Sequence, residues 1–99
     1  MLDRIREKRE EIYAIARRNH AEKVWLFGSC ARREERPESD VDFLVKWTPG
    51  NYSWHNERAM LEAYERMFGR KVELVSNKML FDPENTRFAS VVCKEAVAV

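Results

Sequence analysis

Two aspartates near the middle of the chain, Asp40 and Asp42, stand one residue apart at the start of an apolar run over residues 41–47. The run alternates like a β-strand, in which successive side chains point to opposite faces, so both carboxylates point to the same face. Two carboxylates held side by side repel each other and favour a cation between them. Mg²⁺ prefers carboxylate oxygens and shares its coordination sphere with the phosphates of a substrate. The pair therefore predicts a magnesium site at a sheet edge.

A place for such phosphates lies upstream, at the end of a first apolar strand over residues 23–27. Gly28 lets the backbone approach a ligand closely, and Ser29 offers a hydroxyl and an N–H group. We expect residues 30–35 to form a short helix whose first N–H groups point to the same place. Arg32 lies one turn into that helix, where a guanidinium suits phosphate geometry; the alternative is an ordinary surface arginine.

The aspartate pair also has a plainer interpretation. Asp-x-Asp sequences are common in turns, where the carboxylates accept hydrogen bonds from backbone N–H groups. Taken alone, the pair favours that interpretation. The Gly-Ser sequence before it and the apolar strands on both sides favour the metal site instead.

The residues that carry these features resemble a known family. The segments GSCAR at residues 28–32 and SDVD at residues 39–42 resemble the signature of the polymerase-β-type nucleotidyltransferases. In the form GSxAR…SDxD within one short chain, they are similar to the minimal nucleotidyltransferases. Residues 71–75 fall where that family has a strand with its third carboxylate, so the resemblance implies Glu73 in this role. The family generally has aspartate there, and glutamate has a longer side chain.

The resemblance implies a set of site residues and a cofactor. The implied catalytic and metal-binding residues are Asp40, Asp42 and Glu73. The implied nucleotide-binding residues are Gly28, Ser29 and Arg32. The cofactor is Mg²⁺, with two ions clamping the reacting phosphate, and Glu73 is the candidate base for the attacking hydroxyl.

The resemblance also implies a partner. Minimal nucleotidyltransferases are often the antitoxin half of a two-gene pair, so the expected reaction moves AMP from ATP, or another NMP from its triphosphate, to a protein hydroxyl. The implied acceptor is a tyrosine of a HEPN-domain toxin, usually an RNase, which the bulky anionic adduct silences. Two alternatives stay open. One is a non-catalytic binding module that neutralises the toxin by occlusion, and the other is a subunit of a larger nucleotidyltransferase built from separate chains.

The composition and charge argue against several other classes of protein. The 99 residues predict one domain over residues 1–99, and 44% apolar with 35% charged residues is typical of a soluble globular protein. A net charge of +1 argues against nucleic acid as a direct partner. No run approaches the ~20 apolar residues of a membrane span. Cys30 and Cys93 lack disulfide or metal spacing, so we expect a reducing, cytoplasmic location. Whether the chain forms an oligomer stays an open question.

The site residues need a scaffold of helices and strands. Hydrophobic spacing predicts the order α-β-α-β-α-β-α, an α/β fold in which a small mixed sheet packs with helices. We expect helices at residues 2–19, 30–35, 53–68 and from Asp82 to the end, and strands at residues 23–27, 41–47 and 71–75. The expected boundary residues are Asn19 as a left-handed stop, Ser53 as N-cap, Gly69 after the third helix, and Asp82-Pro83 at the last helix start.

The apolar pattern also orients the strand that bears the aspartates. Val41, Phe43 and Val45 share one side of it, so the register leaves Asp42 on the other side. In the third helix, one stripe is expected to pack in the core, consisting of Trp54, Leu61, Tyr64 and Phe68.

Overall fold

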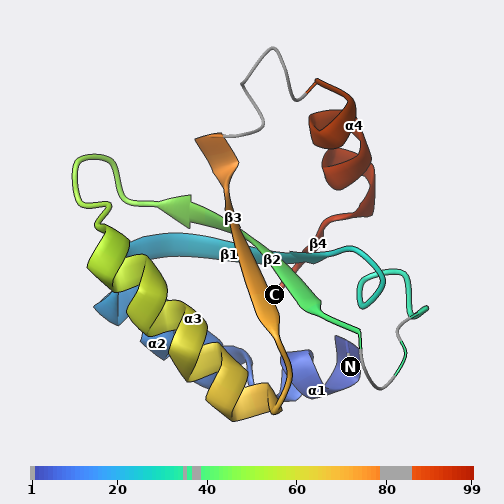
Figure 1. Ribbon diagram of the computed structural model, residues 1–99, viewed down its shortest axis with the longest axis horizontal. Coiled ribbons are helices and arrows are strands. Elements are labelled where there is room, and N and C mark those ends of the chain that lie inside the picture. Colours follow the sequence, from blue (N-terminus) through green and yellow to red (C-terminus); the bar gives the residue numbers. More distant parts are fainter. Residues whose placement is uncertain (1, 35, 37–38, 79–85) are drawn as a thin grey trace.

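The computed structural model describes residues 2–34, 36, 39–78 and 86–99. Its helices are α1 (Leu2–Glu7), α2 (Arg9–Arg18), α3 (Trp54–Phe68) and α4 (Thr86–Glu95) (Figure 1). Its strands are β1 (Ala21–Phe27), β2 (Val41–Trp47), β3 (Val72–Ser76) and β4 (Val97–Ala98). None of these helices combines the length and the apolar character that crossing a membrane requires.

The strands form a mixed sheet in the order β3-β2-β1-β4. β1 runs antiparallel to both β2 and β4, whereas β2 and β3 are parallel. Parallel neighbours need a crossover, and α3 provides it. Ser53 caps α3 by accepting a hydrogen bond from the N–H of His55, and Gly69 ends it with a left-handed φ of 65°. The predicted mixed sheet packed with helices is confirmed, and so are these two boundaries.

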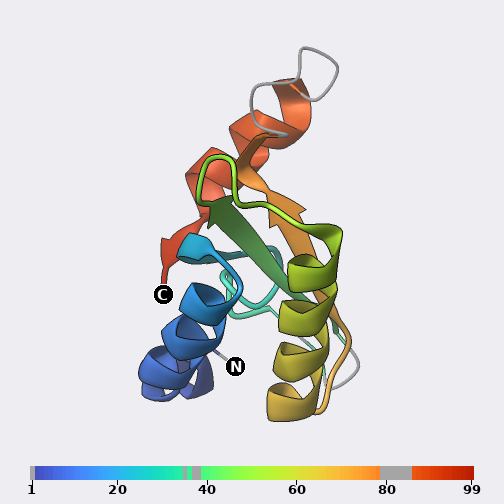
Figure 2. The same ribbon diagram turned by 90° about the vertical axis from the view of Figure 1, so that its left-hand side faces the viewer.

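The helices cover the two faces of the sheet unequally. Figure 2 shows α2 and α3 side by side, with α4 apart from them at the top of the view. The larger core gathers buried side chains from α1, α2, α3 and one face of the sheet, including Val41, Phe43 and Val45 of β2. A smaller cluster joins α4 to the other face through Phe27, Leu44 and Val92. Because side chains alternate along a strand, Asp42 shares the face of Leu44.

The first helix is interrupted where the sequence predicts a continuous one. Lys8 separates α1 from α2, with φ −99° and ψ 16°. The positions three and four residues after the buried Ile5 are Lys8 and Arg9, so no apolar side chain holds the backbone against the core at this point. The left-handed stop predicted at Asn19 is also wrong, because Asn19 has φ −107° and the next residue, His20, has φ 66°.

The last helix is shorter than predicted. It ends at Glu95, and Val97–Ala98 then pairs with β1 as β4. Val99 continues this contact, since it is buried and its N–H donates to the carbonyl of Val24 at 3.3 Å. Pairing satisfies the backbone groups along the edge of β1, which a continued helix would leave open. The start predicted at Asp82-Pro83 lies outside the described residues.

Trp54 is the misplaced member of the expected core stripe. Tyr64 and Phe68 are buried and Leu61 is partly buried, but Trp54 is 61% exposed. The buried line of α3 runs through Met60, Tyr64 and Phe68, at a spacing of four residues. Trp54 and Leu61 lie beside that line, on the side of α3 that faces the edge of β3.

Candidate functional site

Asp42 and Glu73 lie side by side on two parallel strands. The register pairs Asp42 of β2 with Glu73 of β3. Residues paired across neighbouring strands share a face of the sheet. Their chain neighbours Val41 and Val72 point into the larger core, so the two carboxyl groups occupy the opposite face. The structure therefore brings together two of the three carboxylates that the sequence singles out.

This pairing changes the acidity of Asp42. Burial, a hydrogen bond with the Glu73 side chain, and the negative charges of Glu73 and Asp40 raise the pKa of Asp42 from 3.8 to about 7. The positive charge of Arg32 acts in the opposite direction. A bound cation would favour the ionised form in the same way as Arg32 and more strongly, because it would sit closer to the pair. The electrostatics therefore suit a site that takes up positive charge.

Asp40 comes just before β2 and acts on the pair through its charge. Among residues 2–34, 36, 39–78 and 86–99, no three His, Cys, Asp or Glu side chains gather closely enough to hold one metal ion. The structure thus joins Asp42 to Glu73 and places Asp40 as their charged neighbour. Carboxylate oxygens are the ligands that Mg²⁺ prefers, so the chemistry of these donors fits that ion. The site of three carboxylates stays a prediction.

Gly28 packs directly against the carboxylate of Asp42. Its φ is 75°, and a Cβ atom at this position would lie 2.5 Å from Oδ2 of Asp42. Any side chain would collide there, and the left-handed φ favours glycine for a second reason. The N–H groups of Arg32 and Glu34 close the following turn by donating to the carbonyls of Gly28 and Ser29, at 3.2 and 2.9 Å. The predicted phosphate-binding turn therefore lies against the predicted metal site.

The short helix expected at residues 30–35 does not form within the described part of this segment. Hydrogen-bonded turns replace it, and Arg33 has a left-handed φ of 58°, which stops a helix. Cys30 fastens the turn to the aspartate strand, because its buried Sγ donates to the backbone carbonyl of Asp40 at 3.6 Å. The predicted nucleotide-binding residues thus lie on a tight turn rather than at a helix start.

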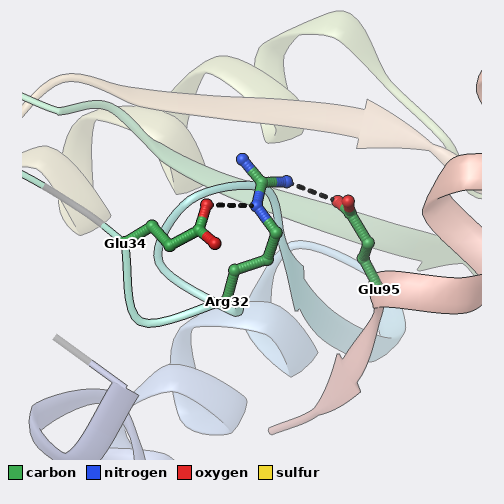
Figure 3. A network of polar contacts seen from close by, with 3 residues as sticks. All are labelled: Arg32, Glu34 and Glu95. Atoms are coloured by element: carbon green, nitrogen blue, oxygen red, sulfur yellow. Dashed lines mark hydrogen bonds and ion pairs between the residues drawn. The ribbon is translucent and has the colours of Figure 1, made fainter.

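Arg32 projects from this turn between two glutamates (Figure 3). Its Nε donates to Oε2 of Glu34 at 3.0 Å, and its Nη1 donates to Oε2 of Glu95 at 2.8 Å. The Arg32 side chain is 41% exposed, so water screens both ion pairs and each contributes little to stability. A phosphate group accepts the same two-pronged hydrogen bonding and carries more charge, so it can replace these carboxylates.

Glu34 and Glu95 are contacts that reading the sequence missed. Glu95 is the last residue of α4 and lies 63 positions from Arg32 in the chain. No local spacing signals such a pair. The neighbouring arginines behave as expected for surface residues, since Arg33 and Arg36 are exposed and Arg33 forms an ion pair with Asp3 at 3.0 Å.

Comparisons with known proteins point to one family. The profile of the family described as "Polymerase beta, Nucleotidyltransferase" matches residues 10–95. A solved structure provisionally described as a minimal nucleotidyltransferase is 33% identical, covers 99% of this chain and 95% of its own, and has a TM-score of 0.81. A protein of Methanocaldococcus jannaschii, provisionally named a protein adenylyltransferase, is 38% identical over 61 residues. That match spans about three-fifths of the relative's length, 61% of each chain.

Two more distant structures share the fold. One is a toxin–antitoxin complex with AMP-PNP, at 19% identity and a TM-score of 0.69 over 90% of this chain and 69% of that chain. The other is a tri-AMPylated HEPN toxin of Shewanella oneidensis in complex with an MNT antitoxin, at 16% identity. Its TM-score is 0.64 over 94% of this chain and 69% of that chain. The likeness confirms the fold that the motif resemblance implied.

Proposed function

This chain belongs to the family of polymerase-β-type nucleotidyltransferases, and on that premise we propose that it is a Mg²⁺-dependent protein adenylyltransferase. The observation that carries the proposal is the pairing of Asp42 with Glu73 across β2 and β3, directly against Gly28. Two carboxyl groups in hydrogen-bond contact at a half-buried position cost stability unless a proton or a cation joins them. A nucleotide–Mg²⁺ complex supplies that cation together with the phosphates that the turn can bind.

The proposed roles follow from position. Asp40, Asp42 and Glu73 hold Mg²⁺, with two ions in the complete site. When bound, the ions neutralise the charge that develops on the reacting phosphate. Gly28, Ser29 and Arg32 bind the β- and γ-phosphates, because Gly28 lies against the Asp42 carboxylate, Ser29 offers a hydroxyl, and the Arg32 guanidinium acts on the same carboxylate. Glu73 is the more exposed member of the pair, which suits a base that must meet an incoming hydroxyl.

The reaction is an in-line displacement. The oxygen of the acceptor hydroxyl forms a bond to the α-phosphorus of ATP as the bond between that phosphorus and the pyrophosphate oxygen breaks. The hydroxyl proton passes to Glu73, and the negative pyrophosphate leaves beside Arg32. Positioning and charge neutralisation supply most of the rate enhancement in such a site.

The proposed acceptor is a tyrosine hydroxyl of a HEPN-domain toxin, which makes this chain an antitoxin that acts by chemistry. Support comes from three similar proteins: one provisionally named a protein adenylyltransferase, a toxin–antitoxin complex with AMP-PNP, and a complex that contains a tri-AMPylated HEPN toxin. An AMP group adds bulk and negative charge, which excludes an RNA backbone from a nearby RNase site.

Mass spectrometry of the intact partner tests the proposal. The chain, ATP and Mg²⁺ are incubated with a purified HEPN-domain protein as acceptor. We expect the partner to gain the mass of one or more AMP units, and Asp42→Asn to abolish the gain. The control is Asp3→Asn, which alters an exposed aspartate paired with Arg33. If the wild-type chain is folded and binds Mg²⁺–ATP, and the partner still keeps its mass, the proposal is contradicted.

The same variant separates chemistry from occlusion. If Asp42→Asn folds, binds the partner and still inhibits its RNase activity, a non-catalytic antitoxin is the correct description. The longer Glu73 in place of the family's usual aspartate is the feature that keeps this second function in view. Loss of inhibition with retained binding supports the transferase.

A further inference from the structure

A groove runs between α3 and the edge of β3, the strand that bears Glu73. Its volume is about 410 Å³, within the range of small ligand pockets, ~300–1,000 Å³. α3 contributes Trp54, Arg58 and Leu61 among its walls, and residues 71–75 form the opposite wall. Glu73 lies in that wall, but its carboxyl group occupies the face of the sheet opposite to α3. Because side chains alternate along a strand, an extended segment paired with β3 places one side chain against α3 and the next on the face of Glu73.

The backbone of β3 is open along this groove. The N–H of Val41 donates to the carbonyl of Lys71 at 2.9 Å, so Lys71 directs its backbone groups toward β2. Alternation then directs the backbone groups of Val72, Leu74 and Ser76 away from β2. Oε2 of Glu65 accepts from the N–H of Val72 at 3.2 Å. The N–H groups of Leu74 and Ser76 have no acceptor within the part of the chain that the structure describes.

Trp54 gives the groove an aromatic anchor. It is 61% exposed, although a tryptophan is among the most costly side chains to leave in water. It lies on the same side of α3 as Arg58 and Leu61, at spacings of four and seven residues. Exposed tryptophans with a neighbouring arginine are typical of the centre of protein interfaces. An edge strand beside such an anchor is the usual receptor for an extended peptide segment.

We propose that this groove docks the acceptor segment of the partner protein. An extended stretch of the partner pairs with β3 at Leu74, covers Trp54, and presents its hydroxyl-bearing side chain to Glu73. This inference rests on the proposed function for the identity of the partner. It adds the surface by which the acceptor is chosen, and it makes strand addition, rather than the nucleotide site, the source of specificity.

Trp54→Ala is the direct test, with Arg66→Ala as its matched control. Arg66 is also an exposed residue of α3, but it lies outside this groove. With the HEPN-domain protein as acceptor, we expect Trp54→Ala to raise the KM for the partner about tenfold or more, as loss of a central aromatic contact does. The Kd for Mg²⁺–ATP should stay within about twofold, as for other exposed substitutions. Equal KM values for the two variants overturn the proposal.

Amide hydrogen exchange in β3 detects binding of the partner without depending on catalysis. On adding the partner, the amides of Leu74 and Ser76 should become protected, whereas Val72, already bonded to Glu65, should change little. If wild-type chain transfers no AMP but Leu74 is protected, the proposed function fails and the docking surface stands. If the Leu74 and Ser76 amides gain no protection in the complex, the docking proposal is overturned. Protection that rises with the concentration of this chain alone overturns it too, because a second copy is then the occupant.

Discussion

The tightest constraint on a single residue is the space at Gly28. An alanine Cβ there would lie 2.5 Å from Oδ2 of Asp42, at a φ of 75°. Gly50 provides the control, with φ 79° and no atom within 4 Å of the corresponding Cβ. Each Gly→Ala substitution should cost about 1–2 kcal/mol of unfolding free energy through the left-handed φ.

Only Gly28→Ala should also push the Asp42 carboxylate away from Glu73. We therefore expect its affinity for Mg²⁺–ATP to fall by about tenfold or more, equivalent to the loss of a charge-assisted contact. Gly50→Ala should bind like the wild type. Urea unfolding and calorimetric titration give the two quantities, and unchanged binding by Gly28→Ala would show that the turn is not the nucleotide site.

Variants of Arg32 and Arg33 distinguish an arginine that binds phosphate from one that is only a surface charge. Arg32 acts on Asp42 and is held by the exposed Glu34 and the partly buried Glu95, which a phosphate can displace, whereas Arg33 pairs with Asp3. Arg32→Ala should weaken Mg²⁺–ATP binding by about 10- to 100-fold, because it removes hydrogen bonds to a charged phosphate group. Arg32→Lys should restore part of it, because lysine keeps the charge without the planar fork. Equal Kd values for Arg32→Ala and Arg33→Ala would assign Arg32 to the surface.

Among the elements, α2 and α3 are joined by one buried hydrogen bond. The hydroxyl of Tyr64 donates to the carbonyl of Ile12 at 2.8 Å, in the larger core. Burial raises the pKa of Tyr64 well above its ordinary range, so this donor keeps its proton. Tyr64→Phe should cost about 1 kcal/mol, which lowers the Tm by about 4–8 °C for a domain of this size.

Tyr52→Phe is the control for that substitution. The Tyr52 hydroxyl bonds to Glu57 at the surface, and its removal should leave the Tm nearly unchanged. Mg²⁺–ATP affinity should not change in either variant, because both hydroxyls lie away from the Asp42–Glu73 pair. A Tyr64→Phe protein as stable as the wild type would mean that the α2–α3 contact rests on apolar packing alone.

For the whole molecule, the carboxyl pair predicts how stability depends on pH. The pKa of Asp42 is about 7 in the folded protein, above its ordinary value of 3.8, which we take for the unfolded chain. Between these values the folded state keeps a proton that the unfolded state has lost, so the unfolding free energy falls as pH rises. The stabilisation is complete below about pH 4 and lost as pH passes about 7.

Comparison with Asp42→Asn isolates this contribution. Without metal, the wild type should lose about 2 kcal/mol more stability than the variant between pH 5 and pH 8, allowing for partial solvent screening. Asp3, whose pKa is lowered by its hydrogen bond with Arg33, acts in the opposite sense and is common to both proteins. Adding Mg²⁺ at pH 8 should raise the Tm of the wild type only. Parallel pH profiles for the two proteins would contradict the pairing of Asp42 with Glu73.

The sequence by itself determined the elements whose signals are local. Alternation in β2 placed Val41, Phe43 and Val45 in the core and Asp42 on the other face, and the structure confirms it. Ser53 and Gly69 marked the ends of the crossover helix correctly. The GSCAR and SDVD segments led to the right family because their chemistry depends on spacing over a few residues. Hydrogen bonding, capping and strand alternation act over such distances, so short stretches of sequence reveal them.

Tertiary structure alone decided the contacts between distant segments. It pairs Val97–Ala98 with β1 instead of extending α4, turns residues 28–34 back on Asp42, and brings Glu95 to Arg32. It also leaves Trp54 in a groove beside β3 rather than in the core. Each outcome depends on which backbone edges and apolar faces remain uncovered once the sheet has formed. A periodic pattern within one segment carries no information about what the rest of the chain has left open.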